Sequence, residues 1–298
     1  MKLGMIGLDT SHCTAFTELL HNGSHPYHVP IGKVVAAFPG GSPDIELSRN
    51  RVPGFQARLA DEYGVRMVDS PAAVAEEVDA IFLESMDGKV HLQQFKEIAL
   101  YGKPVFIDKP LALTHADALA IRELAEKYNV PVMSSSALRF SASMQAWFSK
   151  GGRELVKGVD CFGPMPFEPS QPGLFWYGVH TVEMLYTLMG PGCESVTAAA
   201  NPEHEVITAV WKDGRIATVR GWRSGEAGFS AVVHTDTGAD FIADTPADKP
   251  FYACLLEKIG EFFTTGNPCV SLDETIEIIQ FIEAANQSRE SGQQVKLG

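Results

Sequence analysis

Apolar and polar stretches alternate regularly along the first 136 residues. Short, mostly apolar runs, typical of buried strands, recur at residues 3–6, 33–38, 65–68, 79–84, 104–107 and 130–133. Between them, apolar residues fall at helical spacing, and several of these segments end at a glycine, as at Gly23, Gly64 and Gly102. Strands separated by helices of this length predict right-handed crossovers and a doubly wound parallel sheet.

The pattern changes after about residue 150. Residues 151–173 are rich in glycine and proline, which predicts an irregular segment. Helices are expected at His180–Met189, near Phe251–Phe263 and at Leu272–Ser288. Two strand pairs with central turn signals lie between the first two of these helices, Glu205–Trp222 around Asp213-Gly214 and Phe229–Ala243 around Thr237-Gly238.

These patterns predict an α/β protein of two domains. Residues 1–136 are expected to form a Rossmann-like domain with a doubly wound parallel sheet. Residues 137–298 are expected to form an α+β domain with a mostly antiparallel sheet. The length of 298 residues suits two domains.

Composition and charge narrow the class of protein. Hydrophobic residues make up 45% and charged residues 20%, and no apolar run is long enough for a membrane span. The net charge of −13 argues against nucleic acid and anionic membrane as partners, because both favour basic surfaces. The N-terminus leads directly into a strand-like segment, and the five cysteines are scattered without metal-ligand spacing. We therefore expect a cytoplasmic protein with reduced thiols.

The first strand is followed by Gly7-Leu8-Asp9-Thr10-Ser11-His12, where a dinucleotide-binding fold holds its pyrophosphate. Only the first glycine of G-x-G-x-x-G is present; Asp9 places a carboxylate, and His12 places bulk, at the other two positions. Either the loop binds a nucleotide less closely, with the hydroxyls of Thr10 and Ser11 assisting, or it has abandoned the pyrophosphate. In a third interpretation Asp9, Thr10 and Ser11 only cap the first helix.

The position that distinguishes NAD from NADP carries neither an acid nor an arginine. The second predicted strand ends in Ala36-Ala37-Phe38-Pro39-Gly40-Gly41, and Asp44 and Glu46 follow too late to be good substitutes. The choice between the two cofactors stays open.

Residues 102–114 read Gly-Lys-Pro-Val-Phe-Ile-Asp-Lys-Pro-Leu-Ala-Leu-Thr. This segment closely resembles the G-K-x-V-x-x-E-K-P-x-A-x-T signature of the Gfo/Idh/MocA dehydrogenases, with Asp108 in place of the more frequent glutamate. His91 and Arg139 match two further positions of that family. The resemblance extends over residues 1–140 and resumes at residues 173–192.

The resemblance implies a dinucleotide site and a catalytic lysine. By it, Lys109 would hydrogen-bond the hydroxyl that is oxidised and stabilise negative charge developing on the oxygen, with Pro110 fixing its direction. Without the resemblance, Lys109 would be taken to pair with Asp108 or to extend into solvent. The cofactor-binding residues that follow from the resemblance and the loop position are Gly7, Asp9, Thr10, Ser11, His12, Ser85, His91, Asp108 and Pro110.

Residues 176–180, Trp-Tyr-Gly-Val-His, resemble the family's D-x-G-x-H motif, and this W-Y-G-x-H variant looks like that of a distinct branch of the family. His180 matches the histidine that serves as acid and base in the family, and Trp176 replaces the aspartate. A histidine that only satisfies its hydrogen bonds between the domains is the alternative for His180. Arg139, Trp176 and Tyr177 are the expected substrate contacts, although the two aromatic residues would serve equally well in packing.

Three other features do not predict a site. His21, His25 and His28 lie in a stretch that contains Asn22-Gly23 and Pro26, which is a poor preorganised ligand set, so we expect no metal. Cys13 has no base spaced to activate it. Ser134, Ser135 and Ser136 are expected to line a crevice at a strand end.

The sequence therefore predicts an NAD- or NADP-dependent oxidoreductase that transfers hydride to or from a sugar, cyclitol or related polyol. A homo-oligomer built on the second domain follows from the resemblance alone. A non-redox sugar-active enzyme on the same scaffold, and a non-catalytic sensor of a small metabolite, are the alternatives left open.

Overall fold

A computed structural model of the protein describes residues 1–224, 228–243 and 249–298. The chain divides into two compact units, and each is described by itself. Unit 1 comprises Met1–Ala112, Ala116–Ser135 and Tyr252–Leu272, and unit 2 comprises Leu113–His115, Ser136–Phe251 and Asp273–Gly298. The predicted domain division at residue 136 stays a prediction. In the structure, residues 252–272 also belong to unit 1.

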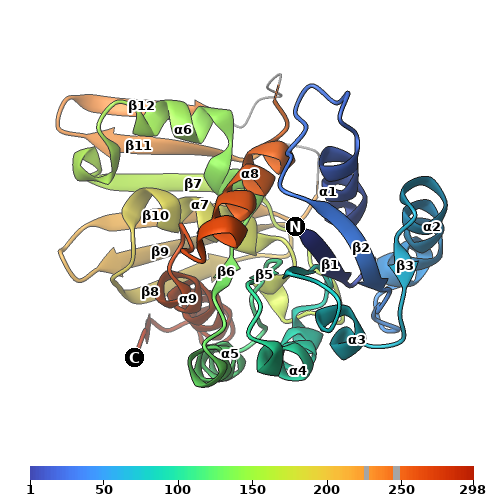
Figure 1. Ribbon diagram of the computed structural model, residues 1–298. Helices are drawn as coiled ribbons and strands as arrows, with labels where there is room; N and C mark the ends of the chain where they lie inside the picture. The colour runs from blue at the N-terminus through green and yellow to red at the C-terminus, as the bar shows by residue number, and fades with distance from the viewer. Residues whose placement is uncertain (225–227, 244–248) are drawn as a thin grey trace. The chain divides into compact units, whose positions relative to one another are not determined.

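Unit 1 is built on a six-stranded parallel sheet in the order β3-β2-β1-β4-β5-β6 (Figure 1). The strands are β1 (Lys2–Ile6), β2 (Lys33–Phe38), β3 (Arg66–Met67), β4 (Ala80–Leu83), β5 (Val105–Ile107) and β6 (Val132–Ser134). Strand β1 pairs with both β2 and β4, so the winding reverses beside it. In such sheets ligands bind outside the carboxyl ends of the strands at this reversal. The prediction of a Rossmann-like doubly wound sheet is confirmed.

The sheet of unit 1 is connected by α1 (Ser11–His21), α2 (Glu46–Tyr63), α3 (Pro71–Ala75), α4 (Gly88–Ile98) and α5 (His115–Tyr128). Helix α2 begins at Glu46 and contains Pro53. A proline inside a helix removes one backbone hydrogen bond. The helix accommodates that loss on a largely exposed surface, since only Ser48 and Leu59 of its residues are buried.

Phe82 on β4 is at the centre of the apolar core of unit 1. The centroid of its ring lies 5.0 Å from that of Phe263, 5.7 Å from that of Phe16 and 6.5 Å from that of Phe106. Phe263 belongs to α8 (Phe251–Thr265), which explains why this late segment folds with the first part of the chain. All four residues of β4 are buried, as a central parallel strand requires.

Unit 2 contains a seven-stranded sheet in the order β12-β11-β7-β10-β9-β8-β13. The strands are β7 (Gly158–Pro164), β8 (Cys193–Ala200), β9 (His204–Trp211), β10 (Ile216–Trp222), β11 (Ser230–Thr235), β12 (Gly238–Ala243) and β13 (Val295–Lys296). Within the part of the chain that the structure describes, only the pairing of β7 with β10 in this sheet is parallel, so the predicted mostly antiparallel sheet is confirmed. Both predicted hairpins, β9–β10 and β11–β12, are present.

The prediction that residues 151–173 are irregular was wrong in part, because they contain β7. This strand lies between β10 and β11 and buries Val159 and Cys161. Gly158, Gly163 and Pro164 hid it, since these residues are depleted in strands. Here the two glycines allow close packing: a Cβ at Gly163 would lie 2.4 Å from the ring of Phe229.

The helices of unit 2 are α6 (Ala142–Phe148), α7 (Gly178–Met189) and α9 (Leu272–Ser291). Every residue of α7 except His180 is buried, which makes this helix the central support of the unit. His180 is therefore the only residue of α7 that is partly exposed.

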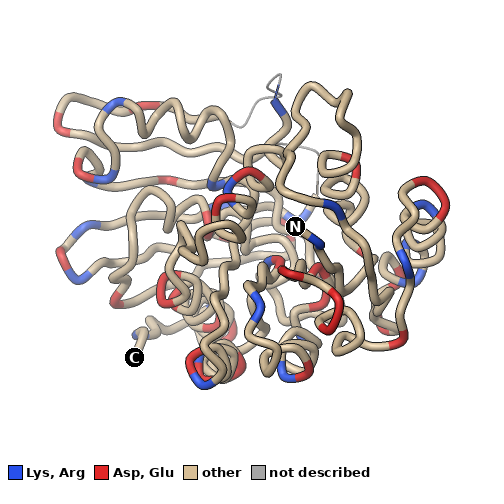
Figure 2. The backbone as a smooth tube through the Cα atoms, in the orientation of Figure 1, with Lys and Arg blue, Asp and Glu red and all other residues tan. Residues whose placement is uncertain are grey.

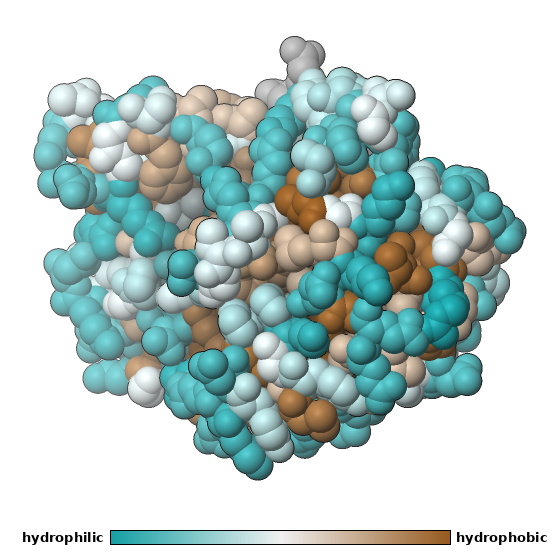
Figure 3. Space-filling view, viewed as in Figure 1, coloured by the Kyte–Doolittle hydropathy of each residue, from teal (hydrophilic) through white to brown (hydrophobic). Residues whose placement is uncertain are grey.

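Charged residues of both signs are distributed along the chain. Figure 2 shows acidic and basic positions interspersed along helices and loops of both units. On the face drawn in Figure 3, apolar residues appear between polar ones. Among the described residues, no helix combines the length and the apolar character that crossing a bilayer requires.

Candidate functional site at the carboxyl edge of the parallel sheet

The turn after β1 packs closely against the end of β4. Gly7 has φ +88°, and a Cβ there would lie 2.4 Å from the backbone nitrogen of Ser85. Only glycine fits both the conformation and the space. The Ser85 hydroxyl donates to Oε1 of Gln94 at 2.9 Å, which holds this end of β4 in place.

The N-terminus of α1 carries no side-chain cap. Thr10 is the N-cap residue, but its hydroxyl makes no capping bond, and its buried oxygen has no hydrogen-bond partner among the described residues. The hydroxyl of Ser11 lies 3.3 Å from that of Tyr252. The interpretation that Asp9, Thr10 and Ser11 only cap the helix is therefore not supported. The first backbone N–H groups of α1 are left for another acceptor, and this arrangement fits a phosphate group.

The carboxylate of Asp9 is turned into the protein rather than toward an incoming phosphate. One of its oxygens accepts from the backbone N–H of Met86 at 2.9 Å, and the other accepts from the hydroxyl of Ser48 at 2.7 Å. Burial raises the pKa of Asp9, although both hydrogen bonds oppose that shift. Asp9 thus links the turn after β1 to α2 and to the loop after β4.

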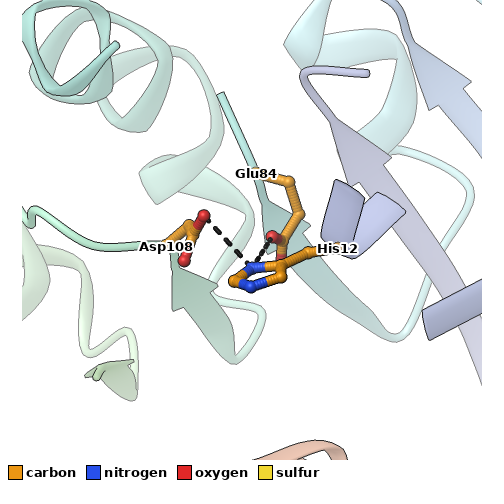
Figure 4. A group of neighbouring side chains, drawn as sticks. All are labelled: His12, Glu84 and Asp108. Atoms are coloured by element: carbon orange, nitrogen blue, oxygen red, sulfur yellow. Dashed lines mark ion pairs between the residues drawn. The ribbon is translucent and has the colours of Figure 1, made fainter. Parts of the chain in front are cut away.

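The side chains of His12, Glu84 and Asp108 form a buried cluster (Figure 4). Nδ1 of His12 lies 3.3 Å from the Glu84 carboxylate and 3.2 Å from the Asp108 carboxylate. His12 comes from the first turn of α1, whereas Glu84 and Asp108 directly follow the adjacent strands β4 and β5. The imidazole stacks on Phe16 at 5.1 Å and meets the edge of Tyr252 at 4.6 Å.

Electrostatics within the cluster are strong because it is excluded from solvent. Burial disfavours the charged form of His12, but the two carboxylates outweigh it and raise its pKa well above the usual value. Burial, together with the charge of Asp108, raises the pKa of Glu84 to about 7. Burial also opposes ionisation of Asp108, but His12 and Lys109 lower its pKa to about 2. The cluster accordingly places an imidazolium beside an ionised Asp108.

The sequence patterns located His12 and Asp108 as separate cofactor-binding candidates and did not identify Glu84. The signal that could have identified Glu84 was its position, because residues that directly follow adjacent parallel strands meet at one edge of the sheet.

The segment after β5 is tied to the same edge. The backbone N–H of Lys109 donates to Oδ1 of Asp108 at 2.8 Å, and the Lys109–Pro110 peptide bond is cis. The ring of His91 is fully buried, with one nitrogen 2.7 Å from the carbonyl oxygen of Ser85 and the other 3.2 Å from that of Leu111. His91 thus holds the loops after β4 and β5 together, and its contact with a cofactor stays a prediction.

In unit 2, His180 is held by a hydroxyl and two aromatic rings. Its Nδ1 lies 2.8 Å from Oγ of Ser136. The ring centroids of Tyr177 and Phe229 lie 5.3 Å and 5.5 Å from the centroid of the imidazole. The rings of Tyr177 and Phe229 stack on each other. Tyr177 is 37% exposed and Trp176 is half-buried, so both retain accessible surface.

Arg139 lies in a buried ion-pair network within unit 2. Its guanidinium lies 2.7 Å from the carboxylates of both Glu183 and Glu274, and Glu274 is also paired with Arg153 at 3.1 Å. The two carboxylates raise the pKa of Arg139 against the opposing effect of burial. This network joins the segment after β6 to α7 and α9, and the predicted contact of Arg139 with substrate stays a prediction.

The histidine-rich stretch does not form a cluster among the described residues. His21, His25 and His28 each contact a different backbone group, namely the N–H of Val34, the N–H of Tyr27 and the carbonyl of Leu19. Cys13 donates its thiol to the carbonyl of Thr10, and burial raises its pKa, so the thiolate is disfavoured.

Comparison with known proteins identifies the first part of the chain. Residues 3–136 match the model of the GFO_IDH_MocA family, described as an oxidoreductase family with an NAD-binding Rossmann fold. The resemblance of the Asp108-Lys109-Pro110 segment to that family is thereby confirmed.

Several solved structures share the fold over the whole chain. A probable dehydrogenase from Thermotoga maritima has a TM-score of 0.81 at 19% identity, with 100% of this chain and 99% of that chain covered. A myo-inositol 2-dehydrogenase from Lactobacillus plantarum has a TM-score of 0.81 at 17% identity, with 100% and 99% covered. A scyllo-inositol dehydrogenase from Lactobacillus casei, solved with NAD(H) and scyllo-inositol, has a TM-score of 0.80 at 15% identity, with 100% and 98% covered. A comparison with curated proteins gave no match.

Proposed function

We propose that the protein is an NAD(P)-dependent oxidoreductase that transfers a hydride between a nicotinamide cofactor and a sugar, cyclitol or related polyol. The match of residues 3–136 to the model of an oxidoreductase family with an NAD-binding Rossmann fold supports the redox chemistry. The inositol dehydrogenases that share the fold support the substrate class, and one of them was solved with NAD(H) and scyllo-inositol.

The observation that carries the proposal is the composition of the carboxyl edge in unit 1. The uncapped N-terminus of α1 and the close turn at Gly7 suit a pyrophosphate, and Lys109 follows β5 at the same edge. Asp9 does not oppose this fit, because its carboxylate is hydrogen-bonded inside the unit. A bound nicotinamide would supply the hydride acceptor.

The family resemblance assigns the chemical roles. Lys109 would donate a hydrogen bond to the substrate hydroxyl, and His180 would take its proton as the carbinol carbon loses hydride and becomes a carbonyl carbon. Trp176, Tyr177 and Arg139 are the proposed substrate contacts, while Ser85, His91 and Pro110 would shape the cofactor site. The contact between Ser136 and His180 supports an oriented imidazole in the acid–base role.

We also propose a cytoplasmic homo-oligomer. The five cysteines are free, which supports a reducing compartment. The family resemblance supports association through the sheet of unit 2, on which Ile216 and Phe241 are 55% and 65% exposed. Sedimentation equilibrium tests the oligomer, and a monomer at micromolar concentration would contradict it.

The function is tested first by calorimetric titration with NAD⁺, NADH, NADP⁺ and NADPH. We expect micromolar binding of one oxidised and reduced pair, followed by reduction of the oxidised form when inositols and related polyols are added. Binding of none of the four would reject the redox proposal and favour a small-metabolite sensor.

Variants of two lysines then separate catalysis from binding. Lys109→Met should abolish turnover and leave cofactor binding within a few-fold of the wild type. Lys103→Met is the matched control, because Lys103 precedes β5 at the opposite end of the same strand. Equal loss of turnover in both variants would contradict the role of Lys109.

A further inference from the structure

The His12–Glu84–Asp108 cluster offers more than the proposed hydride transfer requires. Beyond that function, we propose that these three side chains form a binding site for one divalent first-row transition-metal ion, with Zn²⁺ or Mn²⁺ as the expected occupant.

The donor geometry suits such an ion. One imidazole nitrogen and two carboxylate oxygens lie within 4.8 Å of one another, with Nδ1–O separations of 3.2 and 3.3 Å. Ligands bound at roughly 2.0–2.2 Å to a tetrahedral or octahedral ion lie about 3.0–3.5 Å from one another. Figure 4 shows both carboxylates directed at the same ring nitrogen.

The donor atoms lack the hydrogen bonds that buried polar atoms normally have. Both carboxylate oxygens of Glu84, Oδ2 of Asp108 and Nδ1 of His12 are buried, and none has a hydrogen-bond partner within the described residues. Glu84 and Asp108 are fully buried, so solvent does not replace the missing donors. The imidazole nitrogen can give a proton to only one carboxylate at a time. A divalent cation between the three groups would displace the proton from the His12 imidazolium, because only the neutral imidazole ligates a metal, and would then satisfy all of these atoms together.

The three side chains are also held in position. The backbone N–H of Glu84 donates to the carbonyl of Ile6 at 2.6 Å, and that of Asp108 donates to the carbonyl of Leu83 at 2.8 Å. Asp108 uses Oδ1 to accept from Lys109, which leaves Oδ2 directed at the cluster. The rings of Phe16 and Tyr252 restrain the imidazole. Such support outside the ligands is what a metal site needs.

The ligand set selects the class of ion. An imidazole nitrogen suits zinc, iron, copper and nickel, whereas magnesium and calcium prefer all-oxygen sites. Two carboxylates balance the charge of a divalent ion and extend the choice to manganese. Three protein ligands leave at least one coordination position for water or a small oxygen ligand.

The test is calorimetric titration of the full-length protein, treated with a chelator and dialysed, with Zn²⁺ and separately with Mn²⁺. We expect one equivalent to bind to the wild type and affinity to fall by at least about 100-fold in Glu84→Gln, because even residues outside the ligand shell change metal affinity by about 10–100-fold. Cofactor and substrate are absent, so the result does not depend on the proposed redox function.

Two control variants exclude other sources of binding. His25→Gln tests the histidine-rich stretch, and Asp160→Asn removes the carboxylate that pairs with His234 at 2.8 Å on unit 2. Both control variants should still bind one equivalent of the metal ion. Loss of binding in either control, or binding that Glu84→Gln does not weaken, would overturn the proposal.

A second measurement guards against a variant that fails to fold. Addition of Co²⁺ to the wild-type protein should produce ligand-field absorption bands that Zn²⁺ removes by competition. A wild-type protein that binds neither Zn²⁺ nor Mn²⁺ and gives no such bands has no site, whatever the fate of the variants.

Discussion

Oγ of Ser136 lies 2.8 Å from Nδ1 of His180, and the same hydroxyl accepts from the backbone N–H of Leu138 at 3.3 Å. The hydroxyl is therefore fixed by its own backbone turn and fixes one nitrogen of the imidazole. The predicted resemblance of residues 176–180 to the family's D-x-G-x-H motif, which stays a prediction, would put Trp176 in the place of an aspartate four residues before His180. Ser136 supplies a polar partner for His180 from a different segment of the chain.

Removal of this hydroxyl should affect His180 more than the fold. In Ser136→Ala we expect kcat to fall about 10-fold, which is less than the roughly 10²–10⁴-fold that a positioned acid–base group contributes, because the imidazole is kept and loses only the contact that orients its other nitrogen. The pH profile of kcat/KM should shift in the same variant. Steady-state kinetics from pH 5 to 9 measure both effects.

Ser136→Thr keeps the hydroxyl and is the matched control. It should retain most of the activity and the wild-type pH profile. An unchanged profile in Ser136→Ala, together with wild-type kcat, would show that the hydroxyl does not act through His180.

Arg139 should contribute mainly to stability. Its guanidinium lies between the buried carboxylates of Glu183 and Glu274, so Arg139→Met leaves a buried negative charge without its partner. Breaking a buried ion pair in this way costs about 3–5 kcal/mol of the free energy of unfolding. Urea denaturation of the wild type and the variant measures the difference.

A double variant distinguishes the ion pair from lost packing. Arg139→Met combined with Glu183→Gln should lose less than the sum of the two single variants, since the unpaired charge is removed with its partner. Strictly additive losses would contradict the pairing. A stable Arg139→Met protein with a greatly raised KM would instead support the predicted contact with substrate.

The fold could be predicted from local patterns, whereas the clusters depended on contacts between distant segments. The parallel sheet followed from short, mostly apolar runs, and both hairpins followed from turns such as Asp213-Gly214. Strand β7 was missed because Gly158 and Gly163 weaken the strand signal, and the packing of Gly163 against Phe229 is a tertiary effect.

Some residues of the candidate site could likewise be predicted from local patterns, and others could not. Asp108, Lys109 and His180 were found through motifs, which are continuous in the sequence. Glu84 and Ser136 were not, because each gains its role from a partner far along the chain, His12 for the first and His180 for the second. No spacing rule for short motifs includes such pairs, because the tertiary packing of helices and strands brings their segments together.

Burial should control the reactivity of the cysteines. It raises the pKa of Cys193 to about 12 and raises the pKa values of Cys13 and Cys161 further above the usual range. At pH 8 these three thiols should resist a disulfide reagent, while the exposed Cys269 reacts first and the half-buried Cys254 follows. The rate of release of the reagent's chromophore measures the order.

Cys269→Ser removes the fastest phase if this assignment is right, and denaturant should restore the three missing thiols. A rapid reaction of Cys13 in the folded protein would mean that its environment stabilises a thiolate, contrary to its burial beside Thr10.

Asp9 should be needed for the structure of the loop and should not weaken nucleotide binding. Its carboxylate accepts hydrogen bonds from Met86 and Ser48, so Asp9→Gly leaves two donors without a partner and should lower the free energy of unfolding by about 2–5 kcal/mol. Because the carboxylate is already hydrogen-bonded inside the unit, the restored glycine should not tighten NAD(H) or NADP(H) binding. Calorimetry and urea denaturation of the same preparation test both statements, with Asp9→Asn as the control that keeps an acceptor for Met86 and removes the charge. Tighter cofactor binding in Asp9→Gly and in Asp9→Asn alike would restore electrostatic repulsion as the property that limits this loop.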